Sequence, residues 1–325
     1  MKFFANLGIF VIVISTHSPM HKRLLVALFL IVGSLQVLAQ NQVLVFQSDF
    51  GTKDGAVAAM KGVAVGLSRD LKIFDLTHEI PPFDIWEAAY RLEQTAEYWP
   101  AGTVFVSVVD PGVGSERKSV VLKTKSGHFF VTPDNGTLTL VAETLGIEQV
   151  REIDEARNRR ANSEKSYTFH GRDVYAYTGA ALASGKITFE EVGGELPPKI
   201  VDLPFERPRM EGGVINGNII ILDPQYGNVW TNIHQSLVEK LNLSYGDLLK
   251  VCIFYDDKIV FEEEVPFSKT FEDVAVGENL AYLNSLLNFS LAINQGNFSK
   301  AYEVKSGEGW KIQLKPTQFP MEANR

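Results

Sequence analysis

Apolar and polar positions along residues 43–183 alternate in a way that predicts an N-terminal α/β domain. Short apolar runs that end in polar or glycine-rich turns indicate strands, and longer stretches with apolar residues at helical spacing indicate helices. The expected strands are 43–46, 73–76, 103–109, 119–124 and 128–132, and the expected helices are 54–67, 85–98, 138–145 and 175–183. Such alternation is typical of a mostly parallel sheet that is covered by helices.

The pattern changes after residue 196. Residues 197–209 are rich in proline, which predicts a linker. Beyond it, short β-like runs predominate and helical periodicity is weak; these runs are 213–222, 248–255, 258–265 and 301–304. We therefore expect an N-terminal α/β domain over 41–196 and a smaller C-terminal antiparallel β-barrel-like domain over 210–325.

Residues 1–40 have the character of an export signal. They contain three basic residues and no acidic one, and an apolar run over 24–32 follows His21-Lys22-Arg23. Small residues near Ala39 suit cleavage by signal peptidase, and Met20 offers a second conventional start. The run is shorter than the roughly 20 residues of a membrane span. We expect a cleaved leader, an exported or periplasmic protein and no membrane attachment after cleavage; an uncleaved anchor, or a cytoplasmic protein with a non-functional leader, is the alternative.

Charge and cysteine content exclude several classes of function. The 325 residues include 31 Lys and Arg and 39 Asp and Glu, a net charge of −8. An acidic chain is not expected to bind nucleic acid, because such affinity comes mostly from clustered basic residues. The single Cys252 cannot form an internal disulfide, and no Cys/His cluster suggests zinc or iron–sulfur binding. We expect neither a metal nor a cofactor.

Two carboxylates follow predicted strands. Asp49 comes after 43–46 and Asp110 after 103–109. Because ligands of open α/β sheets lie beyond the carboxyl ends of strands, both should face one crevice. Arg117 is placed to fold back onto Asp110 as a charge-assisted pair, although an exposed ion pair is the plainer interpretation.

Histidines are harder to interpret. His170 precedes the helix expected at 175–183, and its nearest carboxylate in sequence is Asp173. A catalytic role for it requires the fold to bring it to Asp110 or to a ligand, since most lone histidines are structural. We expect His78 to be of that structural type.

In the second domain, residues 223–232 combine a turn with a carboxylate, an amide and an aromatic face. The residues are Asp223, Asn228 and Trp230. This mixture suits a polar heterocycle that carries a cationic group. A β-turn followed by a core tryptophan explains it equally well.

Six motifs in order along 43–315 together carry a family resemblance. They are SDFGTKD at 48–54, DPGVGSER at 110–117, PDNG at 133–136, FHGRD at 169–173, DPQYGNVWTN at 223–232 and YLNS at 282–285. This set resembles the S-adenosyl-L-methionine (SAM) hydroxide adenosyltransferases, which are related to the SAM-dependent fluorinase and chlorinase. The resemblance implies the two-domain fold described above, a homotrimer with substrate held between neighbouring subunits, and SAM as substrate without any cofactor.

The resemblance also implies roles for individual residues. An Asp-Arg-His triad maps onto Asp110, Arg117 and His170, and implies displacement at the ribose C5′ by water or hydroxide, with adenosine and methionine as products. Halogenating members replace the Asp and His, and a carboxylate beside the nucleophile favours water over halide. The implied substrate positions are Asp49 for the ribose, Asp223 and Ser285 for the methionine, Asn228 for the adenine, Phe83, Trp230 and Phe271 for the aromatic lining, and Asp54 in support.

Two departures from the family pattern concern the methionine end: Leu286 stands where the fluorinase branch has Arg, and the glycine usual after the YLNS segment is missing. Two other functions are alternatives to hydrolysis. One is a SAM-dependent halogenase, and the other is a non-catalytic exported protein that binds adenosine-like ligands.

Overall fold

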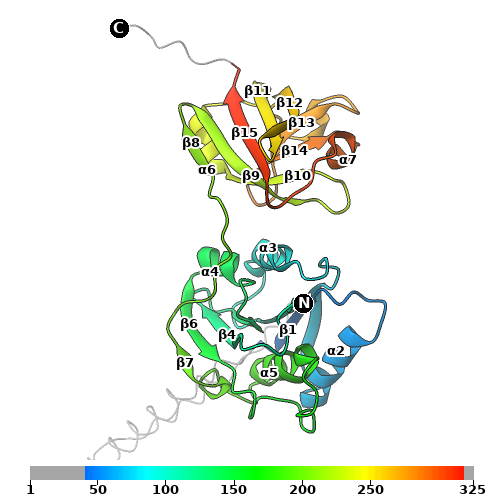
Figure 1. Cartoon of the computed structure of the whole chain (residues 1–325), viewed down its shortest axis with the longest axis vertical. Helices are drawn as coiled ribbons and strands as arrows, with labels where there is room; N and C mark the ends of the chain where they lie inside the picture. The colour runs from blue at the N-terminus through cyan, green and yellow to red at the C-terminus, as the bar shows by residue number, and fades with distance from the viewer. Residues whose placement is uncertain (1–40, 318–325) are drawn as a thin grey trace, which may run out of the picture.

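The computed structural model describes residues 41–317, which form two lobes (Figure 1). The expected leader, residues 1–40, lies outside the described residues and stays a prediction. Within the described part, no helix has the length and apolar character that crossing a membrane requires. The N-terminal lobe is an α/β structure and the C-terminal lobe is built mainly of strands, which confirms the predicted fold class.

A seven-stranded sheet forms the centre of the N-terminal lobe, in the order β2-β1-β3-β5-β4-β6-β7. Its strands are β1 Val43–Ser48, β2 Lys72–Thr77, β3 Val104–Val108, β4 Ser119–Thr124, β5 Phe129–Pro133, β6 Ile147–Glu152 and β7 Glu195–Leu196. Neighbours β2, β1, β3 and β5 are parallel, whereas β4 and β7 run against their neighbours. The sheet is therefore mostly parallel, and β4 and β5 form the expected hairpin.

Helices cover both faces of this sheet. They are α2 Ala56–Leu67, α3 Ile85–Ala96, α4 Thr139–Leu145 and α5 Ala176–Ala183, the last preceded by a π-helical turn at Gly171–Tyr175. Leu44 and Phe46 of β1 pack with α2 and α5, whereas Val43 and Val45 pack with α3 and α4. A strand that is buried on both faces favours apolar residues at successive positions, which is why 43–46 is a continuous apolar run.

Some predicted boundaries differ from the observed ones. α2 begins at Ala56 rather than at residue 54, and α3 ends at Ala96 rather than at residue 98. The N-terminus of α3 is fixed by Asp84, whose Oδ1 accepts a hydrogen bond of 2.8 Å from the Glu87 amide. The pattern did not predict β6 or the π-helical turn, although both lie close to the candidate site.

The C-terminal lobe contains an eight-stranded antiparallel sheet in the order β12-β11-β15-β9-β10-β14-β13, with β8 added beside β9. Its strands are β8 Arg209–Glu211, β9 Val214–Leu222, β10 Val229–His234, β11 Leu248–Tyr255, β12 Lys258–Pro266, β13 Asn279–Leu283, β14 Asn288–Ile293 and β15 Trp310–Pro316. Phe267 and Ala281 form a bridge beyond the end of β12, and the Ser268 amide donates to the Ala281 carbonyl at 2.7 Å. These contacts join the two ends of the strand order and nearly close a barrel.

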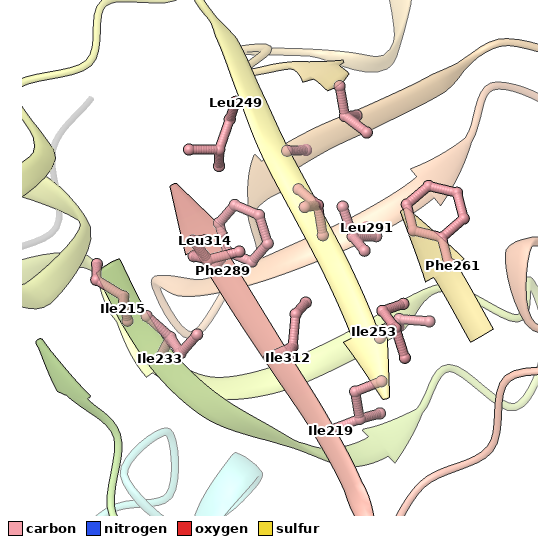
Figure 2. Packing of buried hydrophobic residues seen from close by; sticks show 14 of the residues in the cluster. Ile215, Ile219, Ile233, Leu249, Ile253, Phe261, Phe289, Leu291, Ile312 and Leu314 are labelled. Carbon is pink, nitrogen blue, oxygen red and sulfur yellow. The ribbon is translucent and has the colours of Figure 1, made fainter. Parts of the chain in front are cut away.

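Branched and aromatic side chains fill the interior of this barrel, as Figure 2 shows. Along β9 buried residues alternate with partly exposed ones, so that Ile215 and Ile219 point inward together with Ile233 of β10. From β11, β14 and β15 come Ile253, Leu291 and Ile312. The period of two is that of a sheet with one face in the core.

The strand expected at 301–304 is wrong. Residues Phe298–Tyr302 form the short helix α7, because the Asn297 side chain accepts a hydrogen bond of 2.8 Å from the Lys300 amide and caps the helix. One helical turn also brings the rings of Phe298 and Tyr302 to 4.7 Å from each other, and both pack on Phe261. The final strand is β15 instead, and β13, β14 and the short helix α6 (Gln235–Val238) were not predicted either.

Helix α3 connects the two lobes. Trp86 Nε1 donates to the Ile220 carbonyl of β9 at 2.8 Å, and the ring of Tyr90 lies 6.3 Å from that of Trp230 in β10. Trp86 also packs at 5.3 Å against Phe205, which lies in the segment between β7 and β8. This segment crosses from one lobe to the other without regular structure (Figure 1).

Candidate functional site

A cavity of about 250 Å³ lies where strands β1 and β3 end in the N-terminal lobe. Four of the predicted site residues line it: Asp49, Phe83, Asp110 and His170. They come from three separate loops and from the start of the π-helical turn. The carboxyl ends of parallel strands meet at one edge of a sheet, so the rule that suggested a shared crevice for the two carboxylates gives the correct location.

Asp110 and Arg117 form a largely buried, two-pronged ion pair. Arg117 Nε donates to Asp110 Oδ1 at 2.7 Å, and Arg117 Nη2 also donates to Oδ2. Their side chains are only 6% and 12% exposed, respectively, so this is not an exposed surface pair. Burial alone would lower the pKa of Arg117, but the hydrogen bond to Asp110 and nearby negative groups raise it. Arg117 does not line the cavity itself and acts on it through Asp110.

His170 stands at the start of the π-helical turn and is 7% exposed. Its Nδ1 is buried and has no hydrogen-bond partner among the described residues. Such an unpaired group costs about 1–3 kcal/mol, a cost that functional sites carry more often than ordinary cores. Burial lowers the pKa of His170, while the negative charge of Glu155 opposes this shift. The lowered pKa favours the neutral ring at pH 7.

Gly171 lets this histidine approach the sheet. A Cβ at Gly171 would lie 3.0 Å from Val108 of β3 and 3.2 Å from the ring of Phe50. Real Cβ atoms are rarely so crowded, so a larger residue here would push the π-helical turn away from β3. The glycine in the 169–173 motif is thus explained by the close packing of the π-helical turn on β3.

A chain of hydrogen bonds runs from Arg117 toward His170 through residues that sequence reasoning missed. Arg117 Nη1 donates to Ser119 Oγ at 3.2 Å, and Ser119 Oγ donates to Glu155 Oε1 at 2.6 Å. The hydroxyl of Tyr175 lies 3.0 Å from the same Ser119 Oγ. Glu155 Oε2 then lies 3.8 Å from His170 Nε2. Of these three residues, only Ser119 could have been suspected from the sequence, because it lies two positions after Arg117.

Asp173, the carboxylate nearest to His170 in sequence, belongs to a different group. It is fully buried and accepts hydrogen bonds from Arg160 Nε at 2.8 Å and from Arg172 Nη2 at 2.7 Å. These two ion pairs account for its charge. The carboxylate that faces His170 is Glu155, not Asp173.

Asp49 and Phe83 are in contact at the cavity. The Phe83 amide donates to Asp49 Oδ2 at 3.0 Å. Phe83 has a φ of 70° and is 69% exposed, both unusual for a large aromatic residue. Backbone strain of this kind concentrates at ligand sites.

The predicted residues of the C-terminal lobe form a second group. Asn228 is buried, and it and Trp230 lie beside Tyr282, whose ring is 5.1 Å from that of Phe271. Burial raises the pKa of Tyr282, and the nearby charge of Asp223 adds to this. Tyr282, which was not among the predicted site residues, is thus the centre of the group.

Other predicted residues lie at turns. Asp223 Oδ1 accepts hydrogen bonds from the amides of Gln225 and Tyr226, and Ser285 is exposed in the turn between β13 and β14. Asp54 Oδ1 accepts from the Ala56 amide at the start of α2 and does not line the cavity. The cavity walls come from the N-terminal lobe alone, so within one chain the two groups of predicted residues do not share it.

His78 has the surroundings of a structural histidine. It is 4% exposed, with Nδ1 at 2.7 Å from Ser48 Oγ and Nε2 at 3.0 Å from Asp75 Oδ1. Both ring nitrogens are satisfied, in contrast to His170. Over residues 41–317, no three or more His, Cys, Asp or Glu side chains are grouped as metal ligands.

Comparison with family models gives two matches. Residues 44–193 match the SAM hydroxide adenosyltransferase N-terminal domain, and residues 217–311 match the corresponding C-terminal domain. Together these matches cover both lobes and all of the site residues described above.

Comparison with individual proteins gives relatives that are named either (R)-S-adenosyl-L-methionine hydrolase or fluorinase. The chain is 38% identical to a (R)-S-adenosyl-L-methionine hydrolase of Methanocaldococcus jannaschii over 67% of this chain and 75% of that protein. It is 31% identical to a fluorinase of Nocardia brasiliensis over 85% and 98% of the two chains. A solved structure of an uncharacterized conserved protein from Thermotoga maritima is 36% identical, with a TM-score of 0.77 over 84% of this chain and 99% of that one.

Proposed function

Because the chain belongs to the SAM hydroxide adenosyltransferase family, we propose that it hydrolyses SAM to adenosine and L-methionine. The observation that carries this proposal is the largely buried Asp110–Arg117 pair, whose Asp110 lines the same cavity as the ring of His170. In the reaction, the oxygen of water or hydroxide bonds to the ribose C5′. The bond from C5′ to sulfur breaks, and its electron pair leaves with methionine.

Each member of the triad has a separate task in this mechanism. Attack by water releases one proton. Besides Asp49, which we assign to the ribose, the cavity offers the carboxylate of Asp110 and the ring of His170 as acceptors. Arg117 holds Asp110 through both carboxylate oxygens and fixes its orientation. The positive charge on the sulfonium sulfur makes methionine a good leaving group. The protein's own task is therefore to position water in line with the bond that breaks.

A halogenase is the second candidate, because relatives named fluorinase align over as much of the chain as the hydrolases do. Asp110 opposes this function. A halide ion would have to lose its hydration shell in a cavity that already holds a carboxylate. Water bears no charge and forms a hydrogen bond with that same carboxylate.

We further propose that a homotrimer completes the site, with the C-terminal lobe of one subunit facing the cavity of its neighbour. A cavity of about 250 Å³ is small for a nucleoside linked to an amino acid, since drug-sized ligands occupy about 300–1,000 Å³. Residues for the adenine and the methionine lie instead on the other lobe: Asn228, Trp230 and Phe271, and Asp223 and Ser285. In this arrangement Asp49 and Phe83 hold the ribose, and Asp54 supports the loop that carries Asp49.

Incubation with SAM in ¹⁸O-labelled water tests the reaction directly. Attack at C5′ places the label in the 5′-hydroxyl of adenosine and none in methionine. Asp110→Asn keeps the shape but removes the charge, and we expect it to lower kcat by about 10²- to 10⁴-fold. Asp70→Asn, at an exposed turn, is the matched control.

Three results would argue against hydrolysis. A 5′-halo-5′-deoxyadenosine formed in chloride or fluoride would identify a halogenase. Calorimetric binding of SAM without any product after long incubation would favour the non-catalytic binder. Full activity in both Asp110→Asn and His170→Gln would remove the mechanism. Export is tested separately, by asking whether the protein is found in the periplasm or the medium and where its N-terminus begins.

A further inference from the structure

We propose that Glu155 is a positioning residue for His170, and that it links His170 to the Asp110–Arg117 pair. The inference rests on the proposed function, because its effect is measured on that reaction. Glu155 lies in the loop after β6, outside the six sequence motifs, and does not line the cavity. Its influence on the reaction therefore has to pass through a neighbour.

The carboxylate of Glu155 is held from two sides. Ser119 Oγ donates to Oε1 at 2.6 Å, and the same hydroxyl accepts from Arg117 Nη1 at 3.2 Å. Arg159 Nη1 lies 3.5 Å from Oε2. Arg159 is itself fixed by the Ser163 hydroxyl at 3.1 Å and the Ser166 carbonyl at 2.9 Å. A carboxylate restrained in this way has a defined position relative to both halves of the triad.

Glu155 Oε2 lies 3.8 Å from His170 Nε2, within the range of an ion pair but longer than a hydrogen bond. Contacts of catalytic groups are often long before substrate binds and shorten in the reactive complex. A carboxylate at Nε2 stabilises the imidazolium that forms when the other nitrogen takes a proton. That other nitrogen is the unpaired, buried Nδ1.

Four charged groups act on the His170 ring. Glu155 and Arg159 come from the loop after β6, and Asp110 and Arg117 from the loop after β3. The two carboxylates favour the protonated ring, and the two guanidinium groups disfavour it. After burial itself, Glu155 has the largest influence on the pKa of His170 and raises it.

The test is the pH profile of the Glu155→Gln variant, which keeps the shape of the side chain and loses its charge. Loss of the carboxylate lowers the pKa of His170, so the acid limb of kcat should move to lower pH. We expect kcat at neutral pH to fall on the order of 10- to 100-fold, because the ring loses its orientation. KM should change little, since Glu155 does not line the cavity. Glu155→Asp should restore part of the rate.

Glu164→Gln is the matched control, because Glu164 is exposed on the same loop. In a His170→Gln background, Glu155→Gln should have no further effect on kcat, since a residue that acts through His170 has nothing left to act on. A kcat within about twofold of the unmodified enzyme with an unmoved acid limb, or an equal loss in both backgrounds, would overturn the inference. If the unmodified protein itself forms no adenosine, the proposed function fails instead.

Discussion

At the scale of single residues, His78 shows how a histidine outside the cavity affects stability. Its ring is bound at both nitrogens and buried between Ser48 and Asp75. Burial lowers the pKa of His78 below 6.5, and the interactions with Asp75 only partly oppose this. Between the lowered pKa and 6.5, the unfolded chain therefore binds more protons than the folded one.

It follows that the free energy of unfolding should fall as the pH drops below 6.5 and be constant, as far as His78 is concerned, above it. Urea unfolding at about pH 5 and about pH 7.5 measures this difference. His78→Gln should flatten the slope in part, because His170 has a lowered pKa as well. An equal slope in the protein and in His78→Gln would contradict the prediction.

At the scale of secondary-structure elements, the packing of α5 on the sheet depends on Gly179. A Cβ at this position would lie 2.3 Å from Val106 Cγ2 of β3 and 3.4 Å from Leu44 Cδ1 of β1. Helix propensity alone favours Gly179→Ala by up to about 1 kcal/mol. The steric cost of the added Cβ exceeds this gain in helix propensity, so we expect Gly179→Ala to destabilise the protein by about 1–3 kcal/mol and to lower its Tm.

Gly62→Ala in α2 is the opposite control. No atom lies within 4 Å of a Cβ at Gly62, so this change should stabilise the protein by about 0.4–1 kcal/mol. Thermal unfolding of both variants gives the comparison. If both variants raised the Tm, helix propensity and not packing would determine the effect of Gly179→Ala on stability.

The elements that the sequence predicted well are those with one dominant signal. Strand β1 begins with four consecutive apolar residues, and β9 is rich in branched apolar residues, so a hydrophobic run reveals each of them. Helix α7 is only one turn long, too short for any period to appear, and its capping by Asn297 and aromatic packing on Phe261 decide its conformation.

The residues of the candidate site likewise fall into those that the sequence predicted and those that it did not. Asp49 and Asp110 were predicted to share a crevice because both follow strands of one sheet. The neighbour of His170 was not predicted, because it is set by tertiary contacts and not by distance along the chain. Asp173 is close in sequence but paired with arginines, whereas Glu155 reaches His170 from another loop.

At the scale of the whole molecule, the two lobes carry different parts of the proposed site. If neighbouring subunits share each site, subunits with different defects should complement one another. We expect an equal mixture of Asp110→Asn and Asn228→Ala chains, refolded or coexpressed together, to regain about a quarter of full activity, because about one site in four receives two intact halves. Each variant alone should be nearly inactive.

Size-exclusion chromatography of the mixture provides the control for assembly. A mixture that assembles like the unmodified protein but stays inactive would place both halves of the site in one chain. A monomer of full activity would exclude shared sites altogether.

The bridge between Phe267 and Ala281 nearly closes the C-terminal barrel, so a strand from another molecule has less free sheet edge to pair with there than in the N-terminal sheet. In the C-terminal barrel most strands pair on both sides, whereas β2 is an end strand of the N-terminal sheet and, within residues 41–317, pairs only with β1. Charged Lys72 and Asp75 on β2 discourage a foreign strand from pairing there, but Phe74 is exposed between them. Aggregation of stored protein should accordingly start at this border and be slowed by a charge in place of Phe74.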